Sequence, residues 1–282
     1  MSSSMLFNVT TLAYMVSMFL FFAFLATRQK GVGLAASLVA YFGFLVQTAA
    51  ILLRWKESYV LGHGHAPLSN LYESVVFFSW TIVLIYGILE FKYKYRVIGA
   101  FVVPFALLGM AWAQLTLNSG IEPLVPALQS NWLLYHVITC FLGYAAFAVA
   151  CSISIMYLIK ERLERADGDS PAGGIVAMFP SIKVLDDLNY KAIMVGFPLL
   201  TIGIVTGAAW ANYAWGTYWS WDPKETWSLI VWFVYAAFLH ARMTRGWVGR
   251  RAAILSIAGF VATIFCYLGV NLLLSGLHSY GK

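Results

Sequence analysis

The chain has 282 residues, of which 61% are hydrophobic and 11% are charged. An ordinary soluble domain has about 45–50% apolar and about 25% charged residues, so this composition excludes a soluble enzyme, a disordered chain and a fibrous protein. The apolar stretches run for about 20 residues without the alternation of a membrane β-strand. The predicted fold class is therefore all-α, a polytopic helical membrane protein.

Eight apolar stretches predict eight transmembrane helices within a single membrane domain that covers residues 1–282. The first stretch is long enough to stay as a span and is not expected to be a cleaved signal peptide. The predicted spans are residues 7–27, 33–53, 71–89, 97–117, 133–159, 192–211, 226–243 and 252–274.

Positive charges are divided unevenly between the loops. The formal net charge is +6, and 14 of the 18 Lys and Arg residues follow the first, third, fifth and seventh spans. Cytoplasmic loops carry the excess of Lys and Arg, so these four loops are predicted to be cytoplasmic. Both termini and the loops near residues 54–70, 118–132 and 212–225 are then expected on the extracytoplasmic side.

The longest predicted cytoplasmic loop covers residues 160–191. Its first residues extend the fifth span as a solvated helix, and a Gly/Ser/Pro-type linker follows. Ile182, Leu185 and Leu188 then recur every three residues. This spacing predicts a short helix that lies on the membrane surface.

Tryptophan is concentrated in the segment 210–227. An aromatic belt at the membrane interface explains Trp210 and Trp227, which lie at the ends of spans. The remaining indoles of this segment are too dense to serve only as anchors, and they suggest a platform for a large, planar, apolar ligand. They are Trp215, Trp219 and Trp221.

The acidic residues after these tryptophans have a structural explanation as well. Asp222 is a good N-cap, Pro223 suits a first helical turn, and Glu225 completes a capping box. Asn70 and Glu73 repeat the same spacing before the third span. Both pairs are therefore predicted to start helices, while a role for Asp222 or Glu225 in activating a thiol stays open.

The histidines are His63, His65, His136, His240 and His278. His136 and His278 lie 142 residues apart in the chain but are expected at similar depth, beside the tryptophan-rich segment. Two neutral imidazoles there can supply both axial ligands of a haem iron. His240 lies about 20 Å further down the seventh span than Trp227. An ionisable group at that depth is a functional candidate, and contact with the inner headgroups is the alternative.

The three cysteines, Cys140, Cys151 and Cys266, all lie in apolar spans. None belongs to a Cys-x-x-Cys or Cys-x-x-Cys-His sequence. The chain is therefore predicted neither to exchange disulfides nor to attach haem covalently to itself, and these cysteines are expected to pack as small core residues.

The pattern Trp215-x3-Trp219-x-Trp221-Asp222-x2-Glu225 resembles the WWD motif of haem-handling proteins. Four other segments also resemble the CcsA (ResC) family of the system II cytochrome c maturation pathway. They are residues 64–74, 132–137, 239–242 and 276–280. The resemblance extends from about residue 54 to the end of the chain.

This resemblance implies a site, a cofactor and partners. Haem b is expected to bind non-covalently in transit, with His136 and His278 as outer axial ligands and His240 as a membrane ligand paired with a histidine of the partner. The implied cofactor-binding residues are His136, His278, His240, Trp215, Trp219, Trp221, Asp222 and His65. The implied partners are a CcsB/ResB-type membrane protein, apocytochrome c and thiol-reducing proteins.

The family further implies that the chain and its CcsB/ResB partner together form a cytochrome c synthase, or haem lyase. The expected location is the inner (plasma) membrane, or the thylakoid membrane in a photosynthetic lineage, with the active site on the extracytoplasmic side. Two alternatives stay open: a bis-histidine b-type cytochrome that transfers electrons, and a haem exporter without ligation chemistry.

Overall fold

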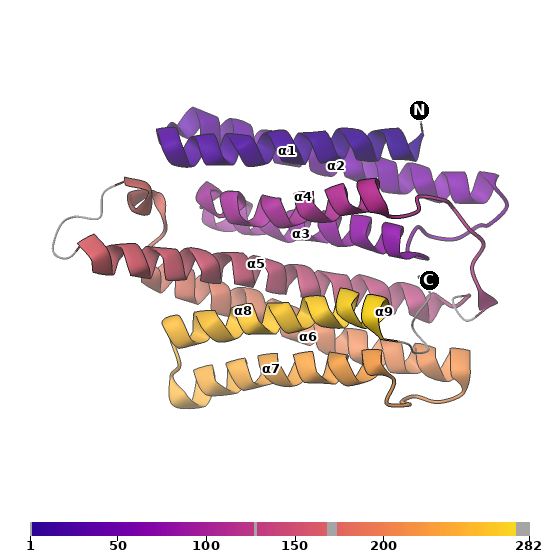
Figure 1. Ribbon diagram of the computed structural model, residues 1–282. Coiled ribbons are helices and arrows are strands. Elements are labelled where there is room, and N and C mark those ends of the chain that lie inside the picture. Colours follow the sequence, from indigo (N-terminus) through magenta and orange to yellow (C-terminus); the bar gives the residue numbers. More distant parts are fainter. Residues whose placement is uncertain (1, 127–128, 168–173, 275–282) are drawn as a thin grey trace.

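The computed structural model describes residues 2–126, 129–167 and 174–274. Its long helices lie side by side along one direction and are joined by loops (Figure 1). No strand occurs in these ranges, which confirms the all-α prediction. The long helices are α1 (Ser3–Thr27), α2 (Lys30–Val60), α3 (Leu71–Tyr93), α4 (Gly99–Thr116), α5 (Asn131–Asp167), α6 (Ile182–Trp215), α7 (Pro223–Arg245) and α8 (Arg250–Ile264). Four short elements complete them: η1 (Arg96–Ile98), η3 (Gly174–Met178), the π-helical turn η4 (Phe265–Gly269) and α9 (Val270–Leu273).

Seven helical segments within these ranges are long and apolar enough to cross a membrane, so the chain is a multi-pass membrane protein. They are α1, α2, α3, α4 with η1, α5, α6, and α8 with its continuation to Leu273. The predicted span 226–243 does form a helix, α7, but α7 is not among these seven. Its tryptophan, tyrosine and histidine side chains, together with charges at both ends, make it less apolar than the others.

Several helices are longer than predicted. The separate surface helix expected near residues 182–188 does not exist, because these residues are the first turns of α6, which continues to Trp215. The hydroxyl of Ser181 caps this start by accepting a hydrogen bond from the N–H of Val184 at 3.3 Å. At the other end of the preceding loop, α5 continues to Asp167, as the predicted solvated extension requires.

Helix α5 runs through the middle of the bundle, with α1–α4 on one side and α6–α8 on the other (Figure 1). Its central segment carries several alanines without any exposed surface, such as Ala145 and Ala148. Because their side chains are small, neighbouring helices approach closely from both sides. This position makes α5 a rigid support for side chains near either of its ends.

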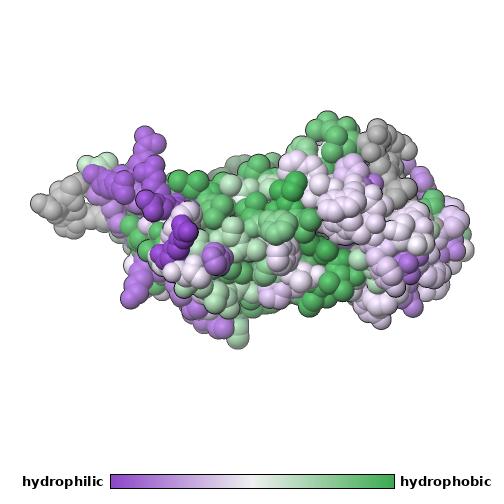
Figure 2. All heavy atoms as spheres, turned by 90° about the horizontal axis from the view of Figure 1, so that it is seen from below, coloured by the Kyte–Doolittle hydropathy of each residue, from purple (hydrophilic) through white to green (hydrophobic). Residues whose placement is uncertain are grey.

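The connections divide between the two ends of the bundle. Those after α1, α3, α5 and α7 lie at one end, and those after α2, α4 and α6 lie at the other (Figure 1). In Figure 2 hydrophilic side chains gather at the first end and a hydrophobic belt covers the middle. The start of α5, the tryptophan-rich segment and α9 meet at the second end.

Candidate functional site

The imidazole of His136 is held in place by α6. His136 lies in the second turn of α5, and its Nδ1 is 2.7 Å from the carbonyl oxygen of Gly203. A carbonyl oxygen only accepts, so in the neutral ring Nδ1 carries the proton and Nε2 carries the lone pair. Metal-binding histidines in proteins are commonly oriented through such a hydrogen bond.

The close approach of His136 to α6 depends on two glycines. A Cβ atom at Gly207 would lie 2.7 Å from Nδ1 of His136, and one at Gly203 would lie 2.5 Å from Sγ of Cys140. The two glycines are four residues apart and therefore lie on one face of α6. This face leaves room for His136 and Cys140, and any larger residue there would displace them.

Trp210 packs against His136 inside the protein. The two rings are stacked, with centroids 5.9 Å apart and an interplanar angle of 27°. Only 3% of Trp210 is exposed, so the prediction that it belongs to a membrane-interface belt is wrong. Its surface is covered because α6 brings it against α5, and this contact joins residues far apart in the chain.

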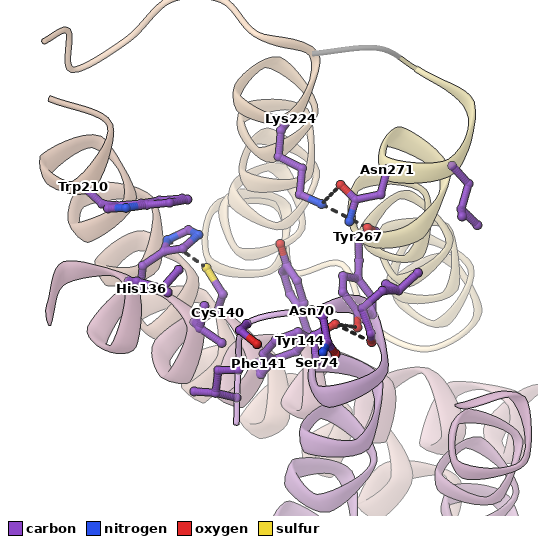
Figure 3. Close-up of a pocket in the computed structure, with 16 residues that line it drawn as sticks. Asn70, Ser74, His136, Cys140, Phe141, Tyr144, Trp210, Lys224, Tyr267 and Asn271 are labelled. Carbon is purple, nitrogen blue, oxygen red and sulfur yellow. Dashed lines mark hydrogen bonds between the residues drawn. The ribbon is translucent and has the colours of Figure 1, made fainter. Parts of the chain in front are cut away.

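A cavity of about 160 Å³ opens beside His136 (Figure 3). Most of its wall is apolar or aromatic, with a few polar groups at fixed places. Pockets that enclose drug-sized ligands measure about 300–1,000 Å³, so this cavity can hold one part of a large planar molecule while the rest stays outside. The polar side chains of its wall are Ser69, Asn70, Ser74, His136, Lys224 and Asn271.

A smaller cavity of about 50 Å³ lies beside the first. It is lined by Tyr218 and Trp219 of the tryptophan-rich segment, and by Gly207 of α6. His136 and Lys224 line both cavities. These two side chains therefore lie where the two cavities meet.

The rings of Trp215, Trp219 and Trp221 differ in orientation and in their neighbours. Trp215 ends α6, and its ring centroid is 5.3 Å from that of Trp210 at an angle of 56°. Trp219 and Trp221 meet edge to face, at 5.8 Å and 88°. Trp221 is 68% exposed. The rings are thus not coplanar, and the flat platform expected from their density does not form in this structure.

Asp222 and Glu225 form the predicted capping box at the start of α7. Asp222 Oδ1 accepts from the N–H of Lys224 at 2.9 Å, and Glu225 Oε2 accepts from the N–H of Asp222 at 3.2 Å. Glu225 Oε2 also accepts from the N–H of Ser220 at 2.7 Å. The two carboxylates therefore fix the turn between the tryptophan-rich segment and α7.

His65 is buried in the loop before α3 and does not line either cavity beside His136. Its two ring nitrogens each lie 2.9 Å from a carbonyl oxygen, Nδ1 from that of Ala66 and Nε2 from that of Glu122. It lines a separate cavity of about 280 Å³. The structure thus connects His65 to the loops before α3 and α5, and does not bring it into the cavities of His136.

A buried ion pair at the start of α3 is not predictable from the sequence pattern. Nε of Arg54 donates to Glu73 Oε1 at 2.7 Å, and both side chains are almost completely covered. The expected N-cap is present, because Asn70 accepts from the N–H of Glu73 at 2.9 Å. The capping spacing was visible in the sequence, but the partner of Glu73 on α2 was not.

The remaining predicted histidines do not join His136 in the described structure. His240 is exposed on α7, toward the end opposite the tryptophan-rich segment. His278 lies outside the residues that the structure describes. Within those residues, no group of three or more His, Cys, Asp or Glu side chains is placed to hold a metal ion.

Residues 68–278 match the family described as cytochrome C assembly protein. The chain belongs to the cytochrome c assembly protein family. Among curated members, it is 45% identical over 251 residues to the cytochrome c biogenesis protein CcsA of Guillardia theta, covering 83% of this chain and 82% of that one. It is 39% identical to CcsA of Gloeobacter violaceus, covering 97% and 94%. The predicted resemblance to CcsA is confirmed.

A solved structure also resembles this cytochrome c assembly protein in fold. It is a cytochrome c heme lyase CcmF, with a TM-score of 0.67 and 18% sequence identity. The match covers 93% of this chain but 47% of that chain, so the present chain spans about half the length of CcmF. At this identity the likeness establishes a shared arrangement of helices and nothing about individual residues.

Proposed function

We propose that this cytochrome c assembly protein binds haem b non-covalently at His136 and presents it for attachment to the Cys-x-x-Cys-His sequence of apocytochrome c. Family membership gives the chain a role in cytochrome c maturation, a process that handles haem and apocytochrome c. The observation that carries the proposal is His136 itself. Its ring is oriented by Gly203, stacked on Trp210 and part of the cavity wall.

His278 is the proposed second axial ligand. Asn271 and Leu272 line the same cavity as His136, and His278 follows Leu273 by five residues. Such a segment spans at most roughly 17 Å when extended, which is enough to return to the cavity. Two histidine ligands would exclude oxygen from the iron and fix the macrocycle in one orientation.

The attachment chemistry is an addition. Each thiol adds its sulfur to one carbon of a vinyl group and its hydrogen to the other, so a C–S bond forms and the C=C bond becomes single. The thiols must be reduced, which is the task proposed for the thiol-reducing partners. His136 holds the iron until the histidine of the peptide replaces it or His278, and this exchange places both thiols beside the vinyls.

The CcsB/ResB-type partner is proposed to dock on the outer face of α7. Exposed residues there recur at intervals of three and four, the spacing of a helix-packing seam. They are Ile230, Phe233, Ala237, His240 and Thr244. His240 in this seam supports an inner haem site completed by a histidine of the partner, since an ionisable residue at this depth requires a partner.

The His136 end is proposed to face the extracytoplasmic side of the inner or thylakoid membrane. The basic loops gather at the opposite end of the bundle (Figures 1 and 2), in agreement with a cytoplasmic assignment of that end. A b-type electron carrier holds its ligand pair within a bundle, whereas His136 lies near a helix end and His240 lies on an outer face. Attachment is therefore favoured over electron transfer.

The proposal is tested by absorption spectra and haem quantification on the detergent-purified complex with its partner. The wild type is expected to show a low-spin bis-histidine spectrum that collapses in the double variant His136→Ala, His278→Ala and returns with added imidazole. His63→Ala is the matched control, because His63 lies in a loop at the same end and does not line either cavity beside His136.

Unchanged haem content and spectrum in the double variant would overturn the site. Haem that accumulates without thioether formation, in the presence of partner and reduced apocytochrome c, would favour an exporter. Reversible redox cycling of a stable haem that is never transferred would favour an electron carrier.

A further inference from the structure

Lys224 brings a positive charge to the edge of the cavity beside His136. It lies in the first turn of α7, just before the predicted span 226–243. Its Nζ donates to the carbonyl oxygen of Tyr267 and to Oδ1 of Asn271, both at 3.0 Å (Figure 3). Both acceptors are neutral, so they orient the ammonium without balancing its charge.

Within the part of the chain that the structure describes, Lys224 belongs to no ion pair, and the nearby charge of Asp222 offsets only part of the effect of burial on its pKa. Glu225 lines the smaller cavity with Lys224, but its Oε2 already accepts from the N–H groups of Ser220 and Asp222. Burial lowers the pKa of Lys224, which means that an anion beside Nζ would stabilise the charged form.

Two other cations predicted on the outer side, Arg54 and Lys56, are placed less suitably. Arg54 is 2% exposed, donates to Glu73, and donates to the carbonyl oxygen of Gly120 at 2.9 Å. Lys56 is exposed on α2 and does not line either cavity. Lys224 is the cation that shares both cavities with His136.

We propose that Lys224 is the anchor for a carboxylate of the ligand that His136 binds, a propionate of haem. This inference rests on the proposed function, and it predicts in addition how the macrocycle is oriented in the site. The propionates and the vinyls occupy opposite edges of haem b. A propionate held at Lys224 therefore turns the vinyl edge away from α7, toward an incoming peptide, and charge-assisted hydrogen bonding makes this orientation specific.

The test compares haem with its dimethyl ester, which has the same iron and vinyls but no carboxylates. Affinities are measured by absorption titration of the purified complex with its partner, for wild type, Lys224→Met and Lys224→Arg. Lys224→Met is expected to weaken haem binding about tenfold and to leave ester binding unchanged. Lys224→Arg retains the charge and is expected to bind haem within a few-fold of wild type.

Each outcome decides the proposal. Wild type that binds the ester as tightly as haem overturns it, and this comparison needs no variant to fold. A Lys224→Met protein that loses both ligands equally also overturns it, because Lys224 would then only support packing. Wild type that binds neither ligand contradicts the proposed function itself, whereas normal haem binding with no ester discrimination contradicts only the anchor.

Discussion

The hydrogen bond between His136 and Gly203 of α6 helps to orient the candidate ligand. The ring donates from Nδ1 to the carbonyl oxygen of Gly203 at 2.7 Å. Residue 207 must be glycine, because a Cβ atom there would overlap with the imidazole. Gly207→Ala is expected to push the ring off Gly203 and to lower haem occupancy about tenfold, since one lost buried hydrogen bond is worth about 1–1.5 kcal/mol. Pyridine haemochrome quantification of the purified complex measures this loss.

Gly31→Ala is the control for that substitution. Gly31 is also helical, and a Cβ there meets nothing within 4 Å. Alanine has a higher helix propensity than glycine by about 1 kcal/mol, so neither substitution should destabilise its helix through helix propensity. Full haem occupancy in Gly207→Ala would mean that the ring position is not what holds the iron.

The role of a single residue can be predicted from the sequence when it depends on residue type and local position. It cannot be predicted when it depends on packing against distant residues. The sequence singles out His136 as a ligand candidate by its residue type and its position near the start of a span, and this role stays a prediction. The burial of Trp210 was missed because its partner ring lies 74 residues earlier, and contact depends on small residues of α6. Likewise, His65 Nε2 contacts the carbonyl oxygen of Glu122, 57 residues later in the chain, and no local sequence pattern predicts this contact.

At the start of α7, substitutions of Asp222 can distinguish a structural role of its carboxylate from a chemical one. Asn and Asp are equally good N-caps, whereas alanine costs about 1 kcal/mol. Asp222→Asn is therefore expected to unfold like wild type and to support haem attachment, while Asp222→Ala is expected to melt a few degrees lower. Thermal unfolding in detergent and a haem-staining assay of cytochrome c measure the two properties.

Loss of attachment in Asp222→Asn, with unchanged thermal stability, would show that the carboxylate does more than cap α7 and would assign chemistry to it. Glu225 is less suited to this comparison, because its Oε2 accepts from two backbone N–H groups and its removal would disturb the whole turn.

Helices were predictable as apolar runs, but their ends were not. The run in residues 33–53 marked α2, which continues to Val60 through polar residues such as Lys56 and Glu57. Glu57 is held at that place by the N–H of Ser3 on α1, at 2.9 Å. At the start of α6, the recurrence of Ile182, Leu185 and Leu188 predicts a separate surface helix, whereas the backbone continues as one helix to Trp215.

For the whole molecule, the two ends of the bundle carry different parts of the proposed function. The His136 cavities lie at one end, and His240 lies toward the other on the exposed face of α7. His240 lies 16 residues after Lys224, which lines both His136 cavities, so the two places are about 24 Å apart along α7. Partner docking on α7 and haem binding at His136 should therefore respond separately to substitution.

Ala237→Trp tests this separation, since it places a large ring in the middle of the proposed docking face. Small residues in a helix interface allow the two backbones to approach closely, and a tryptophan at such a position prevents this contact. Co-purification with the CcsB/ResB-type partner is therefore expected to fall at least tenfold. Leu45→Trp is the control, because Leu45 is 65% exposed on α2. Quantitative affinity pull-down from solubilised membranes measures both.

The haem spectrum of the same preparations distinguishes a docking face from a general defect. If the two sites are separate, Ala237→Trp retains haem at His136 when supplied with it directly, even without the partner. If the variant loses partner and outer haem together, the faces are coupled and the partner helps to form the His136 site. If it retains the partner, the exposed seam of α7 faces lipid, and His240 must find its contact elsewhere.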